Sequence, residues 1–356
     1  MADNTKLTPQ QRAELFGVST RQNFQMLASQ TANTGATSLQ FNLPKARLLS
    51  GLTVNVTAKV DITHPTATSV PSDIFTAYRL LRNISLDLNN GFKPFTLSGE
   101  EIAMYNMISI HPNIVAPQSE NVQGYTYLPK LKAGATGAEN EFSFTVTLPC
   151  TLNKKDPVGF ILLQNNETNV TLTADICNGS ELLNNADGYT VNIKNVTVKV
   201  MVESFSLPVS QNAYPDLSVL KLVNGRVESM PSNGQQVIKL STGTIYRKLI
   251  FKIEDELGNT IVDDDILSNI ELLFNQADCN YSVDARMLRI ENERMLGYAL
   301  PKGMFVFDFS NAGSFVDLGG SRDLIDTSQL TEFWLRFTTK NKGKVKIVSE
   351  CISRLV

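Results

Sequence analysis

The stretch Ser204–Leu220, SFSLPVSQNAYPDLSVL, decides how this chain is divided. The segments on both sides of it alternate apolar and polar residues, which is the period of half-buried strands. The stretch itself has no such period. Proline fixes φ and has no amide hydrogen, so Pro208 and Pro215 do not suit a central strand. We therefore interpret the stretch as a crossing segment that joins two β-domains.

The two sides of the crossing segment share a short repeat. Leu81–Asn89 reads LRNISLDLN and Leu267–Asn275 reads LSNIELLFN, so both fit the pattern L-x-N-I-x-L-x-x-N. A capped helix pattern follows each copy, and such self-similarity indicates two copies of one domain. The repeat predicts that Ile84 and Ile270 occupy equivalent buried positions.

Length and composition agree with a two-domain β-protein. The chain has 356 residues, more than one hydrophobic core usually supports. Charged residues make up 19% of it, below the roughly 25% of an average soluble protein. Thr, Ser, Asn and Gln must therefore supply much of the surface, which suits strands and surfaces that other subunits cover. The net charge of −3 does not indicate binding to nucleic acid through its phosphates.

The cysteines and the start of the chain indicate a protein made in the cytoplasm. The cysteines contain no CxxC pair and are widely spaced, so we expect free thiols in a reducing compartment; they are Cys150, Cys177, Cys279 and Cys351. The first residues lack the apolar core of a secretory signal. No apolar run approaches the ~20 residues that span a bilayer.

The N-terminal region reads as a helical arm. Thr8-Pro9-Gln10-Gln11 combines an N-cap threonine, a proline at the first helical position and a glutamine that completes a capping box. A glutamine-rich segment follows to about Gln30, and we expect Gly17 to break or bend it. Because the segment precedes the first expected strand and is thinly apolar, residues 1–36 are either a frayed terminus or an arm that docks on a neighbouring subunit or a membrane. The candidate contact residues are Leu15, Phe16, Phe24, Met26 and Leu27.

The strand pattern of the first half is clearest over Leu52–Thr63. Every second residue there is apolar, which predicts a long strand with one dry face. The same period recurs over residues 142–148, 170–176 and 191–202. A phase slip of one residue near Asn195 predicts a β-bulge in the last of these strands. Between the strands, Ser98-Gly-Glu-Glu101 is a capping box that predicts a short helix.

The second half repeats this style. Alternation over residues 248–253, 304–309, 333–337 and 344–347 predicts strands, and lysines alternate with apolar residues in the first and last of them. Ser282 is expected to cap a helix that carries Val283, Met287, Ile290 and Leu296 and ends at Gly297. The aromatic residues within the strand patterns are expected to be core; they are Trp334, Phe305, Phe307 and Phe309.

Both halves thus combine several strands, long loops and one helix. The predicted fold is all-β, with two jelly-roll β-sandwiches in tandem, short helices in loops and the N-terminal helical arm. We place the first jelly roll at residues 37–206, the crossing linker at 207–217 and the second jelly roll at 218–356.

The sequence marks no chemistry. The two histidines, His64 and His111, lie beside prolines in loop contexts, and neither has the partners that a catalytic base requires. Zinc spacing and a phosphate-binding loop are absent. Asp263-Asp264-Asp265 lacks the spacing of a calcium loop and reads as a solvated turn. We assign no catalytic, cofactor-binding or metal-binding residue and predict that the chain is not an enzyme.

Three segments carry a resemblance to a known family. They are Leu7–Arg12 (LTPQQR), Leu207–Tyr214 (LPVSQNAY, followed by Asp216-Leu217-Ser218) and Leu300–Phe307 (LPKGMFVF). In this order, and with the duplicated architecture, the chain resembles a tectivirus major capsid protein. That family belongs to the double jelly-roll lineage, which also contains the adenovirus hexon.

The resemblance implies a structural role. It implies two upright jelly rolls per chain, and a homotrimer whose six similar domains fill a hexagonal position in the icosahedral shell of a bacteriophage. The implied partners are neighbouring trimers, penton and minor capsid proteins, and an internal viral membrane near the N-terminal arm, with no direct contact to nucleic acid. The implied location is the virion capsid, after synthesis in the host cytoplasm.

A carbohydrate-binding or carbohydrate-active β-sandwich protein is the alternative. Such a protein needs exposed aromatic residues with carboxylates nearby. The single tryptophan, Trp334, lies within a strand pattern, which counts against this reading.

Overall fold

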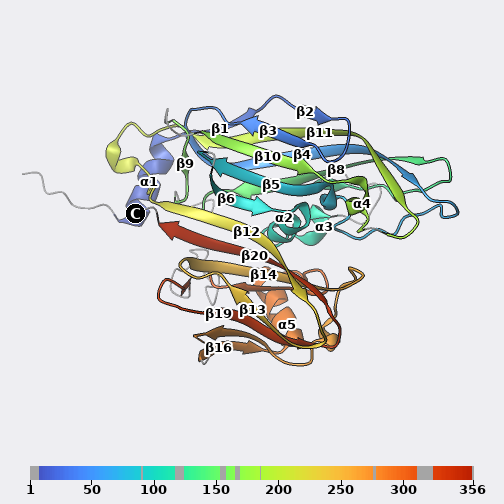
Figure 1. Ribbon diagram of the computed structural model, residues 1–356. Coiled ribbons are helices and arrows are strands. Elements are labelled where there is room, and N and C mark those ends of the chain that lie inside the picture. The colour runs from blue at the N-terminus through green and yellow to red at the C-terminus, as the bar shows by residue number, and fades with distance from the viewer. Residues whose placement is uncertain are drawn as a thin grey trace, which may run out of the picture. The chain divides into compact units, whose positions relative to one another are not determined.

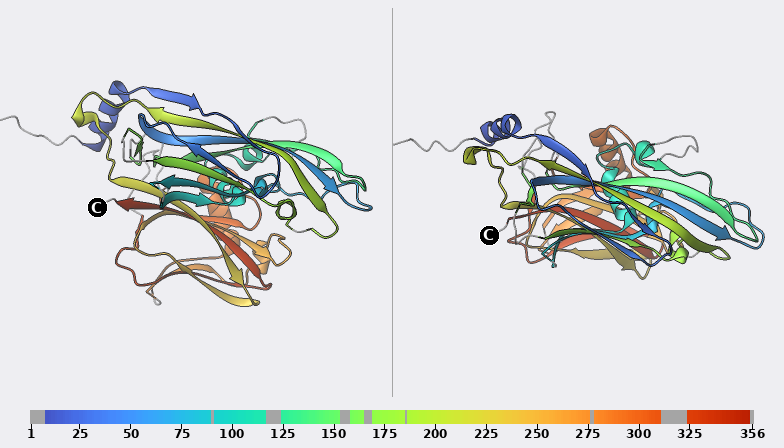
Figure 2. Two further views of the ribbon diagram at one scale, coloured as in Figure 1. Left: turned by 45° about the horizontal axis from the view of Figure 1, so that its top comes forward. Right: turned by 90° about the horizontal axis from the view of Figure 1, so that it is seen from above.

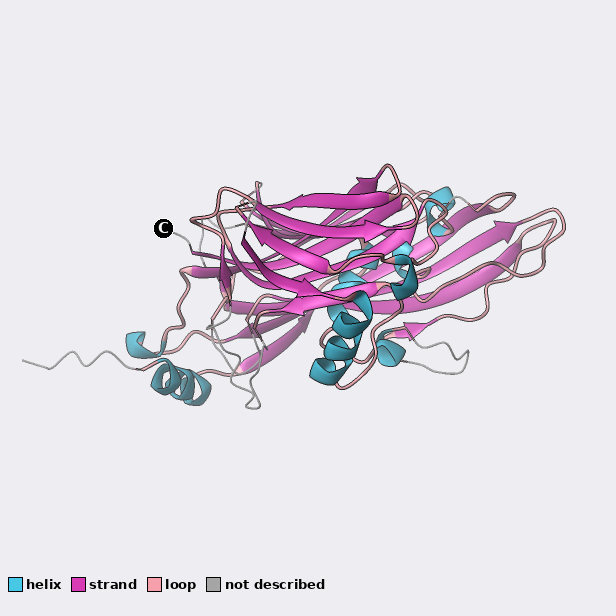
Figure 3. Cartoon of the chain, turned by 90° about the horizontal axis from the view of Figure 1, so that it is seen from below, coloured by secondary structure: helices cyan, strands magenta, loops and turns pink. Residues whose placement is uncertain are grey.

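The computed structural model describes residues 8–89, 91–116, 124–152, 158–164, 169–184, 186–275, 278–310 and 324–354, so Leu7 lies outside it. Strands are the main regular structure of the described chain (Figure 3). The chain forms two compact units. Unit 1 comprises Met1–Thr96, Ser119–Lys221 and Ser353–Val356, and unit 2 comprises Leu97–Gln118 and Leu222–Ile352.

Unit 1 contains two sets of paired strands. The first set runs in the order β1 (Gln22–Met26), β11 (Thr190–Phe205), β4 (Leu48–Thr63), β8 (Ala138–Pro149) and β7 (Thr126–Tyr127), with β2 (Gln30–Ala32) also on β11 and β9 (Ile161–Leu162) on β4. The second runs β6 (Phe92–Leu97), β5 (Leu81–Leu88), β10 (Val170–Ile176) and β3 (Ser38–Asn42). The long strands β4, β8 and β11 lie side by side in every view (Figures 1 and 2).

The alternation in the sequence determines which face of these strands is buried. Val54, Val56, Ala58 and Val60 of β4 are buried, and the residues that alternate with them are partly or fully exposed. Val56 is paired with Phe144 of β8 on one side and with Val198 of β11 on the other, so apolar residues meet across the ladders. The register of β11 shifts between Ile193 and Asn195, which confirms the predicted bulge.

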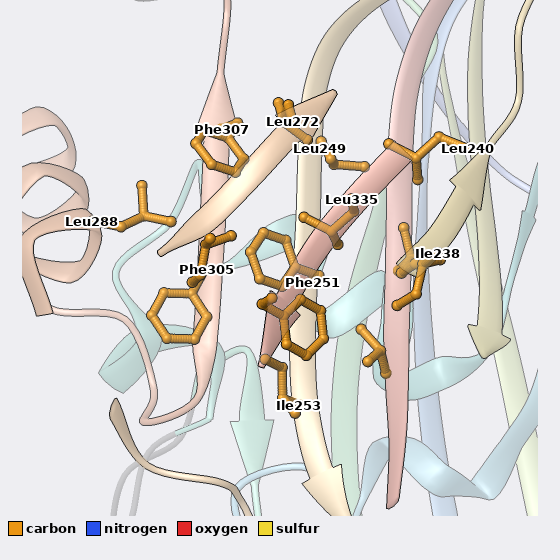
Figure 4. Close-up of a cluster of buried hydrophobic side chains, with 14 of the residues drawn as sticks. Ile238, Leu240, Leu249, Phe251, Ile253, Leu272, Leu288, Phe305, Phe307 and Leu335 are labelled. Carbon is orange, nitrogen blue, oxygen red and sulfur yellow. The ribbon is translucent and has the colours of Figure 1, made fainter. Parts of the chain in front are cut away.

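Unit 2 is built from a second pair of strand sets. One runs β17 (Met304–Asp308), β14 (Ile245–Asp255), β20 (Gly343–Arg354) and β12 (Val219–Met230), with β18 (Ile325–Asp326) also on β14. The other runs β13 (Gly234–Leu240), β19 (Phe333–Thr339), β15 (Ile270–Phe274) and β16 (Asp278–Val283). Apolar side chains from both sets meet in one core, with Phe251 near its centre (Figure 4).

The two units repeat one strand order. In unit 1, β11, β4 and β8 are neighbours, and β9 pairs with β4; in unit 2, β20, β14 and β17 are neighbours, and β18 pairs with β14. The order β6, β5, β10, β3 likewise corresponds to β16, β15, β19, β13. This duplication confirms the predicted fold class of two jelly rolls in tandem.

The sequence repeat lies at corresponding places in the two units. Ile84 of β5 and Ile270 of β15 are both fully buried, as predicted. The asparagines that end the two copies, Asn89 and Asn275, have φ of 57° and 49°, in the left-handed region. Each accepts a main-chain N–H with its Oδ1: Asn89 from Asn169, at 2.8 Å, just before β10, and Asn275 from Thr331, at 3.0 Å, shortly before β19.

The longer helices show which capping predictions hold. In α2 (Gly99–Asn106), the Ser98 hydroxyl accepts the N–H of Glu101 and the Glu101 carboxylate accepts the N–H of Ser98, which confirms the capping box. The helix lies between strands of unit 1 in the sequence, yet it belongs to unit 2. α1 (Pro9–Ser19) has the predicted capping box at Thr8, but it continues through Gly17 without a break.

α5 (Ala285–Leu296) corrects two predictions. Its N-cap is Asp284 rather than Ser282, which lies in β16, and it ends at Gly297 in the left-handed conformation as predicted. Its buried residues are Ala285, Leu288 and Asn292, whereas Met287 and Ile290 are 58% and 50% exposed. The Asn292 side chain fixes this orientation, because its amide exchanges two hydrogen bonds with the main chain of Val306 in β17.

The remaining helical elements are single turns, and they are α3 (Pro112–Val115), α4 (Gly179–Leu182), η1 (Tyr78–Leu80), η2 (Gln211–Ala213) and η3 (Asp263–Asp265). Of these, η2 lies in the crossing segment. Among the described residues, no helix combines the length and the apolar character needed to cross a bilayer.

Candidate assembly surface

The first strand of the fold lies inside the predicted arm. β1 begins at Gln22 and pairs with β11 over its whole length, and β2 pairs with β11 from Gln30. The prediction that a polar segment precedes the first strand as far as about Gln30 is therefore wrong. The sequence QNFQM does not reveal this strand, because its two apolar residues lie on the outer face of the sheet and not in the core.

Phe16 anchors α1 on unit 1. It is 5% exposed, and its ring centroid lies 5.2 Å from that of Phe160 and 5.6 Å from that of Phe205. Leu48 joins the same small cluster, with Leu207 and Leu217 of the crossing segment packed against it. Phe16 is thus a core residue, and its side chain is not available to a partner.

The other four candidate residues are accessible to different degrees. Phe24 and Met26 are each 57% exposed, and Leu15 is 39% exposed. Leu27 is half-buried, and its N–H donates to the carbonyl of Val200 at 2.9 Å. The structure therefore brings Phe24 and Met26 together on one strand and places Phe16 in the core.

The outward direction of Phe24 and Met26 follows from the register. Phe24 is opposite Glu203 and Met26 is opposite Met201, and both partners are half-exposed. Val202, which lies between those partners in β11, is buried. Directly opposite residues share a face of the sheet, so Phe24 and Met26 project from the outer face of the sheet.

The outer face of β4 and β8 is neutral and polar over Thr53–Thr57 and Ser143–Thr147, and Lys59, Asp61 and Glu141 add charge toward one end. The Asn55 amide donates to Ser143 Oγ at 3.2 Å and to Thr145 Oγ1 at 3.0 Å, and the Thr57 hydroxyl donates to Ser143 Oγ at 3.3 Å. These side chains are half-buried. The face fits the expectation that threonine, serine and asparagine replace charged residues on the strands.

Unit 2 contains a buried cluster of charged residues that the sequence did not reveal. The Lys252 ammonium lies 2.8 Å from Glu100 Oε1 and 2.6 Å from Glu254 Oε1, and the Lys346 ammonium pairs with the same two carboxylates. All four residues are less than 9% exposed. Lys252 and Lys346 are buried because α2 carries Glu100 onto them.

The electrostatics of this cluster stabilise its charged form. Burial lowers the pKa of Lys252, but the adjacent carboxylates of Glu100 and Glu254 together outweigh burial and raise it above its usual value. Burial also raises the pKa of Glu101, which follows Glu100 on α2. Nearby, the Arg247 guanidinium pairs with Glu350 at 2.6 Å, and the Tyr105 hydroxyl donates to the other oxygen of Glu350.

The acidic run and the histidines have structural partners. Asp263 pairs with Arg289 at 2.8 Å, Asp264 with Arg286 at 2.7 Å and Asp265 with Lys340 at 3.2 Å. The run forms η3, a paired turn rather than a purely solvated one. His64 Nδ1 accepts the main-chain N–H groups of Thr66 and Ala67, and His111 Nδ1 accepts that of Asn113. Within the described ranges, no three His, Cys, Asp or Glu residues are grouped to hold a metal ion.

The cysteines and Trp334 differ in their exposure. Cys150, Cys177 and Cys351 are buried, Cys279 is exposed, and all four are free thiols. Trp334 is half-exposed on β19, between the buried Phe333 and Leu335, so its prediction as core is wrong. Phe305, Phe307 and Phe309 are buried as predicted.

The class of fold is that of the double jelly-roll viral major capsid proteins. One solved structure of similar fold is that of the major capsid protein of Sulfolobus turreted icosahedral virus, with a TM-score of 0.67 and 15% identity over 94% of this chain and 97% of that chain. PBCV-1 VP54, fitted into a reconstruction of the virophage Sputnik, has a TM-score of 0.65 and 11% identity over 95% of both chains.

A bacteriophage protein is also similar in structure. The major capsid protein of bacteriophage PM2 has a TM-score of 0.53 and 12% identity, over 94% of this chain and 98% of that chain. No protein-family model matches the sequence, and no curated protein is similar to it in sequence. At these identities the likeness establishes the fold.

Proposed function

We propose that this protein is the major capsid subunit of an icosahedral virus. The observation that carries the proposal is that the whole chain, with both jelly rolls, matches capsid proteins that are themselves matched over nearly their whole length. A single β-sandwich occurs in many functions, so fold alone is a weak guide to activity. A match to two β-sandwiches in tandem, over nearly the whole chain, is more specific than a match to a single β-sandwich. The protein would be located in the virion capsid after synthesis in the host cytoplasm.

The finer proposal is a trimeric capsomer in a bacteriophage with an internal membrane, as in the tectiviruses. Two similar units per chain support it, because three chains then present six similar units to a hexagonal lattice. Its partners would be copies of itself, then penton and minor capsid proteins and the membrane beneath the shell. The role would be structural rather than enzymatic.

The exposed apolar residues near the N-terminus support a contact at that end of unit 1. Leu15, Phe24 and Met26 are candidates to bury against a neighbouring subunit or the membrane, and Val18, 89% exposed, adds to this apolar surface. Phe16 would keep α1 in place on its own unit.

Electron microscopy of the purified chain at high concentration tests the proposal. A capsid subunit should appear as uniform capsomers that form hexagonal arrays or closed shells. Monodisperse single chains that never associate, at any concentration or salt, would contradict it.

A further inference from the structure

β1 is the end strand of its sheet, and its open edge is unpaired in the described part of the chain. Ser206 N–H donates to Arg21 O at 3.0 Å, and Leu27 N–H donates to Val200 O at 2.9 Å. In an antiparallel ladder these bonds recur at every second residue. The main-chain groups of Asn23 and Gln25 therefore face β11, and those of Gln22, Phe24 and Met26 face the open edge.

Four other end strands, β17, β3, β13 and β7, are protected or very short. The Asn292 side chain donates to the main-chain carbonyl of Val306 in β17 and accepts its N–H. The Gln30 amide donates to the carbonyl of Gln40 in β3. β13 carries the exposed Lys239, and β7 has only two residues. Native proteins use such devices to stop edge strands from pairing with other chains.

β1 has none of these devices. Its sequence, QNFQM, contains no charged residue, no proline and no glycine, and four of its five residues are exposed. A neutral strand with exposed Phe and Met is an open template for strand pairing. An unprotected edge of this kind is expected where the native assembly covers it.

We propose that the open edge of β1 pairs with the β1 edge of a second copy of this chain, antiparallel across a two-fold axis between capsomers. The inference rests on the proposed capsid function, which supplies copies of the chain at high local concentration. Pairing centred on Phe24 places Phe24 opposite its own copy and Gln22 opposite Met26. About six main-chain hydrogen bonds then form, and Arg21 lies opposite Leu27 rather than another cation.

The chemistry of the edge favours a second copy over other occupants. A neutral strand meets itself without like-charge repulsion, and a two-fold contact requires one self-complementary surface. A pairing of five residues is too small to hold free capsomers together. It becomes effective when many such contacts act at once in a shell.

Cysteine cross-linking tests the geometry. In a Cys279→Ser background, which removes the exposed thiol, Phe24→Cys places two Cα atoms about 5.5 Å apart across the proposed axis, within reach of a disulfide. Asn23→Cys is the matched control, because its copy lies about 7–8 Å away on the diagonal. After mild oxidation of assembled particles, Phe24→Cys should give about tenfold more linked chain pairs than Asn23→Cys. Equal cross-linking, or none with Phe24→Cys, would overturn the proposal.

A main-chain test separates strand pairing from burial of an apolar side chain. Phe24→Pro removes an N–H that faces the open edge and leaves the bonds to β11 intact. Phe24→Ser removes the aromatic ring and keeps that N–H. The yield of shells should fall about tenfold with Phe24→Pro and clearly less with Phe24→Ser, while both variants keep the capsomer mass. Equal losses, accompanied by equal losses of binding to anionic lipid vesicles, would instead identify a membrane as the occupant.

The outcomes distinguish the inference from the proposed function. If the wild-type chain forms shells but Phe24→Cys does not cross-link, the strand-pairing inference fails and the capsid function stands. If the wild-type chain forms neither capsomers nor shells, the proposed function fails, and the inference fails with it.

Discussion

At the scale of single residues, Asn89 and Asn275 show how the duplication is maintained. Both asparagines end their copy of the repeat in the left-handed region. Asn89 accepts the main-chain N–H of Asn169, just before β10, and Asn275 accepts that of Thr331, shortly before β19. Alanine at either position would lose the acceptor and strain the backbone, at a cost of about 1–3 kcal/mol. Glycine would lose only the acceptor. We expect urea unfolding to rank the wild type above Asn→Gly and Asn→Gly above Asn→Ala at both sites.

The buried thiols make a second prediction at this scale. Burial raises the pKa of Cys150 to about 12 and that of Cys351 to about 11. Alkylation of the native protein near pH 8 should therefore modify the exposed Cys279 alone, and denaturation without reductant should expose all four thiols. Mass spectrometry counts the modified sites. An intact disulfide would contradict the reading of the cysteines as free.

The same thiols predict how stability depends on pH. Their pKa values are higher in the folded protein than the value of about 8.5 of an unfolded thiol. The folded state thus retains protons that the unfolded state loses, so this contribution is complete below about pH 8.5 and falls as the pH rises toward 11–12. Cys150→Ala should make the free energy of unfolding fall less steeply with pH between about pH 8.5 and 12.

At the scale of elements, the N-terminal arm belongs partly to the core. An arm that served assembly alone could be deleted without loss of stability. Phe16, however, packs on Phe160 and Phe205, and β1 pairs with β11. Phe16→Ala should cost about 3–5 kcal/mol, the usual range for a buried phenylalanine. Leu15→Ala, at a half-exposed site on the same helix, is the control and should cost much less. Equal effects in thermal unfolding would show that α1 is not anchored through Phe16.

The charged cluster beneath α2 yields another prediction at this scale. Glu100→Gln leaves two buried ammonium groups, Lys252 and Lys346, with Glu254 as their remaining carboxylate in the cluster. Removing one partner of a buried ion pair costs about 3–5 kcal/mol. Adding Lys346→Met should recover part of that loss, and Glu293→Gln on the exposed face of α5 should change little. If Glu100→Gln left the free energy of unfolding in urea unchanged, the cluster would not be needed to hold α2.

The elements also show what the sequence could reveal. β4 was predictable because a buried apolar residue at every second position is a local pattern, and the bulge near Asn195 visibly interrupts the same kind of pattern in β11. The burial of Lys252 and Lys346 could not be predicted from their own strands, because it depends on α2, a helix far away in the sequence. β1 was missed because a tertiary contact, not its own period, places Phe24 on the outer face. The duplicated fold was therefore readable, whereas most of the candidate assembly surface was not.

At the scale of the whole molecule, we predict that the purified chain is a stable trimer. Charged residues make up only 19% of the chain, and the outer faces of the long strands rely on threonine, serine and asparagine. Surfaces of this kind are well suited to burial between subunits, and closed cyclic symmetry buries them without continued association. Two similar units per chain favour three copies, because six similar units tile a plane.

Light scattering during size-exclusion chromatography measures the assembly directly. Three chains of 39.3 kDa should give a particle of about 118 kDa. Phe24→Pro should leave this mass unchanged, because β1 is proposed to act between capsomers and not within one. A monomer at micromolar concentration would contradict the capsomer and favour a binding module with the same fold. A dimer would be nearly as damaging, since four sandwiches do not form a six-sided tile.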